Sequence, residues 1–260
     1  MRIPDKIVVI TGAGHGIGAA LAIRFAAEGA RAVVVSDIDG AAAEQVAAEI
    51  GKQALAVAAD VSEEAQVRDL VATAERERGP IDLFCSNAGV AFGSGLDAGS
   101  EDWARAWSVN LMPHVYAARA VLPAMMARGS GYLLNTASAA GLLTSPGDAA
   151  YTASKHAAVG LAEWLALTYG SRGVGVSVLC PMGVRTDLLM KGVEAGDPAA
   201  LAVAASADII EPEAVADAVC AGLAEERFLI LPHPAVGTMY AHKASDPDRW
   251  LAGMRRAFSE

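Results

Sequence analysis

Short runs of apolar, often β-branched residues alternate along the chain with longer stretches whose apolar positions recur at helical spacing. The short runs predict strands at residues 7–10, 33–35, 54–58, 81–85, 131–136, 174–179 and 228–231. The longer stretches predict helices at residues 17–28, 41–50, 63–78, 100–128, 149–170 and from 211 onward. Strands that alternate with helices in this way are typical of βαβ units around a parallel sheet. Because such crossovers are right-handed, we expect an α/β, single-domain Rossmann fold, with a doubly wound parallel sheet of about seven strands and helices on both faces.

Two segments depart from this alternation. Residues 185–208 follow the sixth predicted strand and are Ala/Gly-rich and poorly periodic, which predicts a mobile lid. The C-terminal tail, residues 232–260, carries no motif. Pro113 and Pro123 fall inside the long predicted helix, and we expect them to bend or divide it. No linker or internal repeat separates these parts, so one domain over residues 1–260 is the simplest interpretation.

Composition narrows the class of protein. Hydrophobic residues make up 53% of the chain but aromatic residues only 5%, which suits Ala-, Val- and Leu-rich helices packed on a buried parallel sheet. The net charge of -10 repels phosphate backbones, so we expect no nucleic-acid partner. The mean hydropathy is +0.34. However, no stretch reaches the roughly 18–20 uninterrupted apolar residues of a spanning helix, so we expect no membrane partner.

The cysteines and the N-terminus bear on the compartment. Cys85, Cys180 and Cys220 form no C-x-x-C pair and are odd in number, so we expect buried small side chains rather than disulfides. The chain runs from Met1 into the first predicted strand without the apolar region of a signal peptide. Both observations favour a cytoplasmic protein.

A glycine-rich turn joins the first predicted strand to the first helix. It comprises Gly12, Gly14, His15, Gly16, Ile17 and Gly18. Glycine lets a backbone turn tightly and approach a ligand closely, and the helix that follows directs its free N–H groups at the turn. The turn therefore predicts a pyrophosphate site, with a tight βα turn that binds nothing as the alternative. Because the chain lacks G-x-x-x-x-G-K-[ST], a nucleoside triphosphatase is disfavoured.

Asp37 follows the second predicted strand, 19 residues beyond Gly18. In a dinucleotide fold, an acidic residue at this offset accepts hydrogen bonds from the adenosine ribose hydroxyls and repels a 2′-phosphate. NAD is therefore favoured over NADP. The alternative role for Asp37 is a helix N-cap, which Asp39 could provide instead. His15 weakens the preference slightly because a cation there could meet a 2′-phosphate, although His is mostly neutral at neutral pH.

Two more strand ends point to the same edge of the sheet, where open sheets bind ligands. After the third predicted strand, Asp60 could meet the adenine amine and Val61 its ring, although Asp60 could equally cap the next helix. After the fourth, Asn87, Ala88 and Gly89 offer small residues beside a cofactor.

Tyr151 and Lys155 are four residues apart on a predicted helix and therefore share a face. A nearby ammonium stabilises a phenolate and lowers the phenol pKa. A tyrosine tuned in this way can donate a proton to a forming alkoxide, or remove one from an alcohol, near neutral pH.

Two polar residues could complete this pair. Ser138 follows the fifth predicted strand, 13 residues before Tyr151, where its hydroxyl can orient the reacting oxygen. The alternative for Ser138 is a simple turn hydroxyl. Asn110 lies in the long helix, where Asn competes with the backbone. A helix distortion that holds a water near Lys155 and an exposed surface side chain explain Asn110 equally well.

In this order and spacing, the motifs resemble those of the short-chain dehydrogenase/reductase superfamily, in its single-domain type of about 250 residues. The resemblance runs from about Lys6 to Leu231. The matching elements are Thr11-Gly12-x-x-x-Gly16-Ile17-Gly18, Asp60-Val61, Asn87-Ala88-Gly89, Asn110, Ser138, Tyr151-x-x-x-Lys155, and Pro181-x-Gly183 followed by Thr186.

The resemblance implies a role for each matching residue. Tyr151 would be the general acid/base, and Lys155 would lower its pKa and bind the nicotinamide ribose. Ser138 would hold the substrate oxygen, and Asn110 would anchor a water in the proton relay. Thr186 would contact the carboxamide. The peptide groups of the Pro181 to Gly183 element, near Met182 and Val184, would line the nicotinamide. Similar chains are often homotetramers, so we expect a homo-oligomer, with a tetramer favoured and a dimer as the alternative.

The expected substrate pocket is largely apolar and holds no cluster of cations. It is predicted to include Ala139, Ala140, Leu142, Leu143, Val90, Phe92, Met182, Leu188, Leu189 and Met190. This predicts a neutral, hydrophobic secondary alcohol or ketone as the substrate of an NAD-dependent oxidoreductase. The alternatives are an NADP(H)-preferring carbonyl reductase, an epimerase or dehydratase, and a non-catalytic NAD-binding regulator. No metal is expected, because the spacing of the histidines is unlike that of metal ligands.

Overall fold

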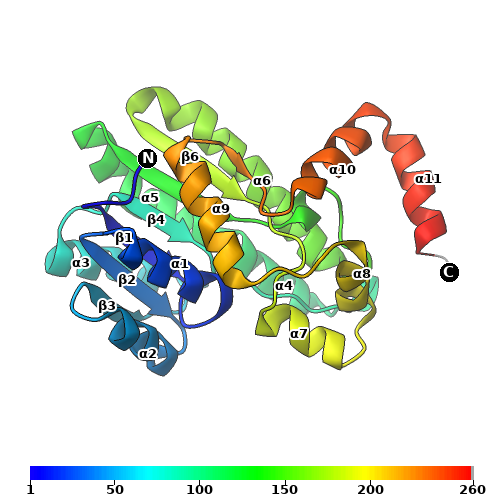
Figure 1. The fold of residues 1–260 in the computed structure, drawn as a ribbon, viewed down its shortest axis with the longest axis horizontal. Helices are drawn as coiled ribbons and strands as arrows, with labels where there is room; N and C mark the ends of the chain where they lie inside the picture. The colour runs from blue at the N-terminus through cyan, green and yellow to red at the C-terminus, as the bar shows by residue number, and fades with distance from the viewer. Residues whose placement is uncertain (259–260) are drawn as a thin grey trace.

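Parallel strands form one twisted sheet with helices packed on both faces (Figure 1). The computed structural model describes residues 1–258. The seven strands in that range lie in the order β3-β2-β1-β4-β5-β6-β7. They are β1 (Ile7–Thr11), β2 (Ala32–Asp37), β3 (Ala54–Ala58), β4 (Leu83–Ser86), β5 (Gly131–Thr136), β6 (Val174–Leu179) and β7 (Leu229–Ile230). The strand order reverses between β1 and β4, and a doubly wound sheet binds its ligands at the carboxyl ends beside such a point. The predicted fold class is confirmed.

The helices cover the sheet in two layers, each with its own apolar core. One core joins the sheet to α3, α5, α6 and α10, and the other joins it to α1, α2 and α9. The helices are α1 (Gly16–Ala27), α2 (Gly40–Ile50), α3 (Glu64–Arg78), α4 (Ser100–Asn110), α5 (Met112–Arg128), α6 (Ala149–Tyr169), α7 (Asp187–Glu194), α8 (Pro198–Ser206), α9 (Pro212–Ala224), α10 (Pro234–Ser245) and α11 (Pro247–Ala257). Because the sheet is covered on both faces, strands such as β1 are buried at every position, which explains their continuous apolar sequence.

The long helix predicted at residues 100–128 is divided. α4 ends at Asn110, and α5 begins at Met112. Pro113 lies in the first turn of α5. Proline is tolerated there because the N–H groups of a first turn have no partner within the helix. Pro123 lies inside α5 without ending it. Of the two prolines, only the first therefore marks the division.

The segment 185–208 and the C-terminal tail are more regular than their sequences indicate. The first contains α7 and α8, and the second contains α10 and α11, which is drawn in red at one end of the molecule in Figure 1. A start signal was present in the sequence, because α8, α10 and α11 each have Pro in the first turn. No helix within residues 1–258 is long and apolar enough to cross a membrane.

Candidate active site

A cavity of about 1510 Å³ opens at the carboxyl ends of the strands. It brings together residues from the glycine turn, the strand ends, α6, the 185–208 segment and the C-terminal helices. Most residues predicted to bind a cofactor or to react line it. Those lining it are Gly12, His15, Gly16, Ile17, Gly18, Asp37, Asp60, Val61, Asn87, Ala88, Gly89, Ser138, Tyr151, Lys155, Pro181, Val184 and Thr186. Gly14, Asn110 and Gly183 do not line it.

The glycine turn packs so closely that side chains are excluded from it. Gly12 has a φ of +61°, and a Cβ there would lie 2.8 Å from the Cα atom of Ala88. A Cβ on Gly18 would lie 2.1 Å from the carbonyl oxygen of Gly12. No side chain caps the N-terminus of α1, and the residues of its first turn, from Gly16 to Gly18, line the cavity. This arrangement fits a pyrophosphate.

The carboxylate of Asp37 is fixed at the end of β2 and lines the cavity. Its Oδ2 accepts from the N–H of Gly14 at 2.9 Å, and its Oδ1 accepts from the N–H of Asp39 at 3.0 Å. The N-cap of α2 is Asp39, which accepts from the N–H of Ala42. The cap interpretation of Asp37 is therefore wrong, and its carboxylate lines the cavity instead.

Asp60 does not cap a helix either. The N-cap of α3 is Glu63, whereas Asp60 Oδ1 accepts from the N–H and hydroxyl of Ser62. Asp60 and Val61 both line the cavity. Asn87 donates from its side chain to the carbonyl oxygens of Thr11 and Gly12, which ties β4 to the glycine turn.

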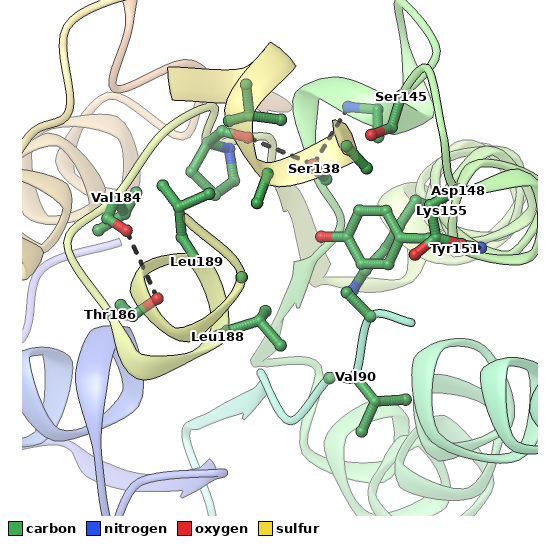
Figure 2. A pocket seen from close by; sticks show the side chains of 18 of the residues that line it. Val90, Ser138, Ser145, Asp148, Tyr151, Lys155, Val184, Thr186, Leu188 and Leu189 are labelled. Carbon is green, nitrogen blue, oxygen red and sulfur yellow. Dashed lines mark hydrogen bonds between the residues drawn. The ribbon is translucent and has the colours of Figure 1, made fainter. Parts of the chain in front are cut away.

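Tyr151, Lys155 and Ser138 meet at one side of the cavity. Figure 2 shows the Tyr151 hydroxyl directed into the cavity beside Ser138, with Leu188 and Leu189 across from it. The Lys155 Nζ lies 5.7 Å from the centre of the Tyr151 ring and donates to the carbonyl of Thr136 at 3.0 Å. The hydroxyl of Ser138 accepts from the N–H of Ala140, so it is held by the turn after β5.

Burial dominates the electrostatics of this group. It lowers the pKa of Lys155 to about 8, and it raises the pKa of Tyr151, with the Ser138 hydroxyl acting in the opposite direction. The net direction at Tyr151 is therefore upward, whereas the spacing to Lys155 predicted a lower pKa. Desolvation is the largest cause at both residues, because burial favours the neutral form of each group.

Asn110 is a buried structural link. Its side chain is 0% exposed, so the surface interpretation is wrong. It exchanges two hydrogen bonds with the backbone of Val90, at 2.8 and 3.0 Å, and donates to the hydroxyl of Ser154 at 3.1 Å. Asn110 therefore ties the chain after β4 to α6, and the helix distortion predicted at this residue is the division between α4 and α5.

Sequence reasoning missed two residues that fix the site. Asp148 is 3% exposed and caps α6 by accepting from the N–H of Tyr151, while its other oxygen accepts from the N–H groups of Phe92 and Gly93. Its position three residues before Tyr151 is an N-cap signal that could have found it. His233 Nδ1 accepts from the N–H of Met182.

His233 also makes a second bond to the same loop. Its Nε2 lies 3.0 Å from the carbonyl of Gly183, so the tautomer with the proton on Nε2 satisfies both contacts. The imidazole thereby holds the backbone of the Pro181–Gly183 element through two hydrogen bonds. Only the tertiary structure brings residue 233 to this loop, since the two are 50 positions apart in the sequence.

Eight of the ten residues expected around the substrate line the cavity, and two do not. Leu142 packs in the core, and Met190 does not line the cavity. The structure adds a wall that the sequence did not indicate, from α8 and the C-terminal helices. That wall contains Ala199, Ala202, Val203, Met239, Trp250, Met254, Ala257 and Phe258. Within residues 1–258, no group of three His, Cys, Asp or Glu side chains could hold a metal ion.

The chain resembles known proteins along most of its length. Residues 6–196 match the family model described as short chain dehydrogenase. The meso-2,3-butanediol dehydrogenase of Serratia marcescens is 40% identical over 190 residues, which cover 72% of this chain and 75% of that protein. The 1-deoxy-11-beta-hydroxypentalenate dehydrogenase of Streptomyces avermitilis is 36% identical over 260 residues, which cover 97% and 93% of the two chains.

A solved structure confirms the likeness in three dimensions. A short chain dehydrogenase/reductase from Burkholderia phymatum, in complex with NAD, superposes with a TM-score of 0.87 at 32% identity and covers 95% of this chain and 96% of its own. Sequence motifs, family model, relatives and fold agree, and the protein belongs to the short-chain dehydrogenase/reductase family.

Proposed function

We propose that this short-chain dehydrogenase transfers a hydride between NAD(H) and a neutral, apolar secondary alcohol or ketone, with Tyr151 as the general acid/base. The observation that carries the proposal is the joint position of Tyr151, Ser138 and Lys155 in the same cavity as the glycine turn and Asp37. Asp37 would hold the adenosine end of a dinucleotide bound here, and Tyr151 would lie at its reactive end.

The chain's own residues supply the proton chemistry. In alcohol oxidation, the phenolate of Tyr151 takes the hydroxyl proton while the carbinol C–H bond breaks and its electron pair leaves as hydride. The oxidised nicotinamide, when bound, supplies the hydride acceptor and a positive charge near the phenol. Ser138 hydrogen-bonds the substrate oxygen, and the Lys155 ammonium favours the phenolate. In ketone reduction, Tyr151 returns the proton to the forming alkoxide. Pro181, Val184 and Thr186 line the same part of the cavity and are proposed to hold the nicotinamide.

The direct test is turnover followed by the absorbance of reduced nicotinamide with a panel of secondary alcohols. Tyr151→Phe is expected to bind NAD but to lose turnover by at least about a hundredfold, because a general acid/base contributes roughly 10²–10⁴-fold. Tyr240→Phe is the matched control, since Tyr240 is 36% exposed and does not line the cavity. Near-normal turnover by Tyr151→Phe would refute the mechanism.

The preference for NAD rests on Asp37. Its carboxylate is held by two backbone N–H groups at the cavity wall, where it would repel a 2′-phosphate. The solved relative from Burkholderia phymatum carries NAD, which supports the proposal. Asp37→Ala is expected to raise the NADP-to-NAD ratio of kcat/KM by about tenfold or more, which corresponds to roughly 1.4 kcal/mol. Asp39→Ala, which removes only a helix cap, is the control, and an unchanged ratio in Asp37→Ala contradicts the assignment.

The size and lining of the cavity favour a bulky substrate. Its volume of about 1510 Å³ exceeds the roughly 300–1,000 Å³ of an ordinary ligand pocket, which leaves room for a substrate beside a dinucleotide. The wall made by α8 and α11 is apolar, and Trp250 also packs against the core. One relative is named for a short diol and another for a hydroxypentalenate. The extra wall favours the larger and more apolar class of substrate for this chain.

Trp250 offers a test of that substrate class. Trp250→Ala is expected to lower kcat/KM for a bulky cyclic secondary alcohol by about tenfold, because it removes most of an aromatic contact surface. The same variant should change kcat/KM for 2-butanol little. Leu251→Ala is the control, since Leu251 is 53% exposed and does not line the cavity. An equal loss for both alcohols, or a preference of the parent protein for phosphorylated substrates, contradicts the proposal.

Rival functions predict different outcomes in the same assays. A non-catalytic NAD-binding regulator would bind NAD without turnover of any alcohol. An epimerase or dehydratase would convert substrate without net formation of reduced nicotinamide. The homotetramer and the cytoplasmic location stay predictions, and light scattering of the purified protein tests the first of them.

A further inference from the structure

His233 lies where the chain passes from β7 to α10, and it is 5% exposed. It stands at the N-cap of α10, but its side chain makes no capping bond there. The imidazole bonds the Pro181–Gly183 element instead, which follows β6. Pro181 and Met182 line the cavity, whereas Gly183 and His233 do not. The ring therefore holds the element from outside the cavity, where it does not touch a bound ligand.

One of its two bonds goes to a peptide group whose other end holds Ser138. The N–H of Met182 donates to Nδ1 of His233 at 3.2 Å. The carbonyl of the same peptide group belongs to Pro181 and accepts from the N–H of Ala139 at 2.8 Å and from the Ser138 hydroxyl at 3.4 Å. A peptide group is planar, so bonds to its N–H and its C=O together fix its rotation about the chain. The imidazole and the turn after β5 thus hold this plane from opposite sides.

The second bond holds the end of the element. Nε2 of His233 donates to the carbonyl of Gly183 at 3.0 Å, and the same oxygen accepts from the N–H of Ile210 at 3.1 Å. Only the neutral ring with its proton on Nε2 can accept at one nitrogen and donate at the other in this order. One rigid imidazole therefore sets the distance between two backbone groups of the element. The residues that follow, Val184 and Thr186, line the cavity.

The backbone that carries the imidazole is itself anchored. Pro234 is the first residue of α10, and the N–H of Val236 donates to the carbonyl of His233 at 3.0 Å. Val236 is 0% exposed and packs in the core that joins α10 to the sheet. The N–H of Cys180 donates to the carbonyl of Ile230 at 3.0 Å, which ties the end of β6 to β7. A ring on such a fixed backbone is preorganised to hold the element in one conformation.

We propose that His233 is a positioning residue for the nicotinamide end of the site: by fixing the peptide group between Pro181 and Met182, it orients both the cavity wall there and Ser138. The inference rests on the proposed function, in which Pro181, Val184 and Thr186 hold the nicotinamide. A misplacement of about 1 Å at the reacting atoms costs about a hundredfold in rate. A residue that touches neither cofactor nor substrate therefore affects the rate through the backbone that it holds.

The two ends of the dinucleotide should respond differently to a change at His233. Asp37, at the proposed adenosine end, is held by the N–H groups of Gly14 and Asp39, which belong to other segments than residues 181–186. ADP-ribose is NAD without its nicotinamide, so it would not use the wall that His233 holds. Loss of the imidazole should therefore weaken the binding of NAD and spare that of ADP-ribose. A role in stability alone would affect both ligands alike.

The test compares His233→Phe, which keeps a planar ring without hydrogen bonds, with His233→Asn and His233→Gln. Calorimetry measures the Kd of NAD and of ADP-ribose for each variant. In His233→Phe we expect the Kd of NAD to rise about tenfold and that of ADP-ribose to change by less than about twofold. Asn keeps an acceptor near the position of Nδ1 and Gln a donor near that of Nε2. One of them should return the Kd of NAD to within about threefold of the parent value.

His156→Phe is the matched control and should leave both Kd values unchanged. His156 bonds the carbonyl of Thr152 within α6 and does not line the cavity. At saturating NAD, kcat of His233→Phe should also fall about tenfold, because the peptide group that holds Ser138 is no longer fixed. An unchanged kcat contradicts this link to Ser138. Equal changes in the Kd of NAD and ADP-ribose, or no change in either, would overturn the proposal.

Where His233→Phe does not fold, ¹⁵N NMR of histidine in the parent protein decides. The proposal expects a neutral His233 ring with its proton on Nε2 and a hydrogen-bonded Nδ1 at mildly alkaline pH. A protonated or free Nδ1 refutes it. Failure of the proposed function would show in the parent protein, as a lack of NAD binding or of alcohol turnover. Failure of this inference would leave both of these intact.

Discussion

Replacing Asp148 with Ala should destabilise the protein and displace Tyr151 together. The carboxylate is 3% exposed and accepts three backbone hydrogen bonds, from Tyr151 at 2.9 Å, from Phe92 at 2.8 Å and from Gly93 at 3.0 Å. Loss of an N-cap costs about 1 kcal/mol. Each of the two loop N–H groups that loses its charged acceptor adds about 1.5 kcal/mol. The expected destabilisation is therefore about 4 kcal/mol.

Thermal unfolding followed by circular dichroism measures this effect. In a domain of this size, 1 kcal/mol shifts Tm by about 2–4 °C, so Asp148→Ala should melt about 10 °C below the parent. Asp39→Ala is the matched control, because Asp39 also caps a helix but accepts only the bond from Ala42 and is exposed. It should lose about 1 kcal/mol. We also expect kcat of Asp148→Ala to fall at least about tenfold with little change in NAD binding, because Tyr151 stands in the turn that the cap holds.

A Tm of Asp148→Ala no lower than that of Asp39→Ala would refute the reasoning, since it would mean that the second oxygen contributes nothing. A large loss of Tm with unchanged kcat would separate the two consequences. In that case the cap stabilises α6, but the position of Tyr151 does not depend on it.

Two further substitutions test the packing of the site. Lys155→Met should abolish turnover yet raise stability at pH 7 by about 2 kcal/mol: a pKa lowered from 10.5 to about 8 opposes folding by roughly 3 kcal/mol below pH 8, and the lost bond to Thr136 offsets about 1 kcal/mol. Above pH 8 the folded lysine is already neutral, and the unfolded lysine loses its proton toward pH 10.5, so this advantage should shrink across that window. Chemical unfolding at pH 7 and pH 10 measures it, and a less stable variant at pH 7 contradicts the sign. Gly18→Ala places a Cβ 2.1 Å from the carbonyl oxygen of Gly12 and should weaken NAD binding at least about tenfold in calorimetry. Gly253→Ala, in α11 with open space around its Cα, should leave binding unchanged.

The alternation of short apolar runs with amphipathic stretches was sufficient to predict the fold class. Both signals are local: a strand buried on two faces must be apolar throughout, as β1 is, and a helix such as α3 keeps one apolar face. The motifs at strand ends also came from sequence, because the carboxyl ends of parallel strands meet at one edge. That rule placed Asp37 and Ser138 in one cavity before their contacts were known.

The tertiary structure decided what lies around those motifs. His233 contacts the loop at Met182, and Trp250 lines the cavity, only because the folded chain brings these distant segments together. Burial likewise depends on neighbours rather than on residue type. It made Asn110 a structural link, and it raised the pKa of Tyr151 where the spacing to Lys155 alone predicted a lower one. The sequence by itself thus determined the fold class and the places of the glycine turn and of the Tyr151–Lys155 pair. Desolvation and contacts between distant segments, which no local pattern encodes, decided how those residues are charged, held and enclosed.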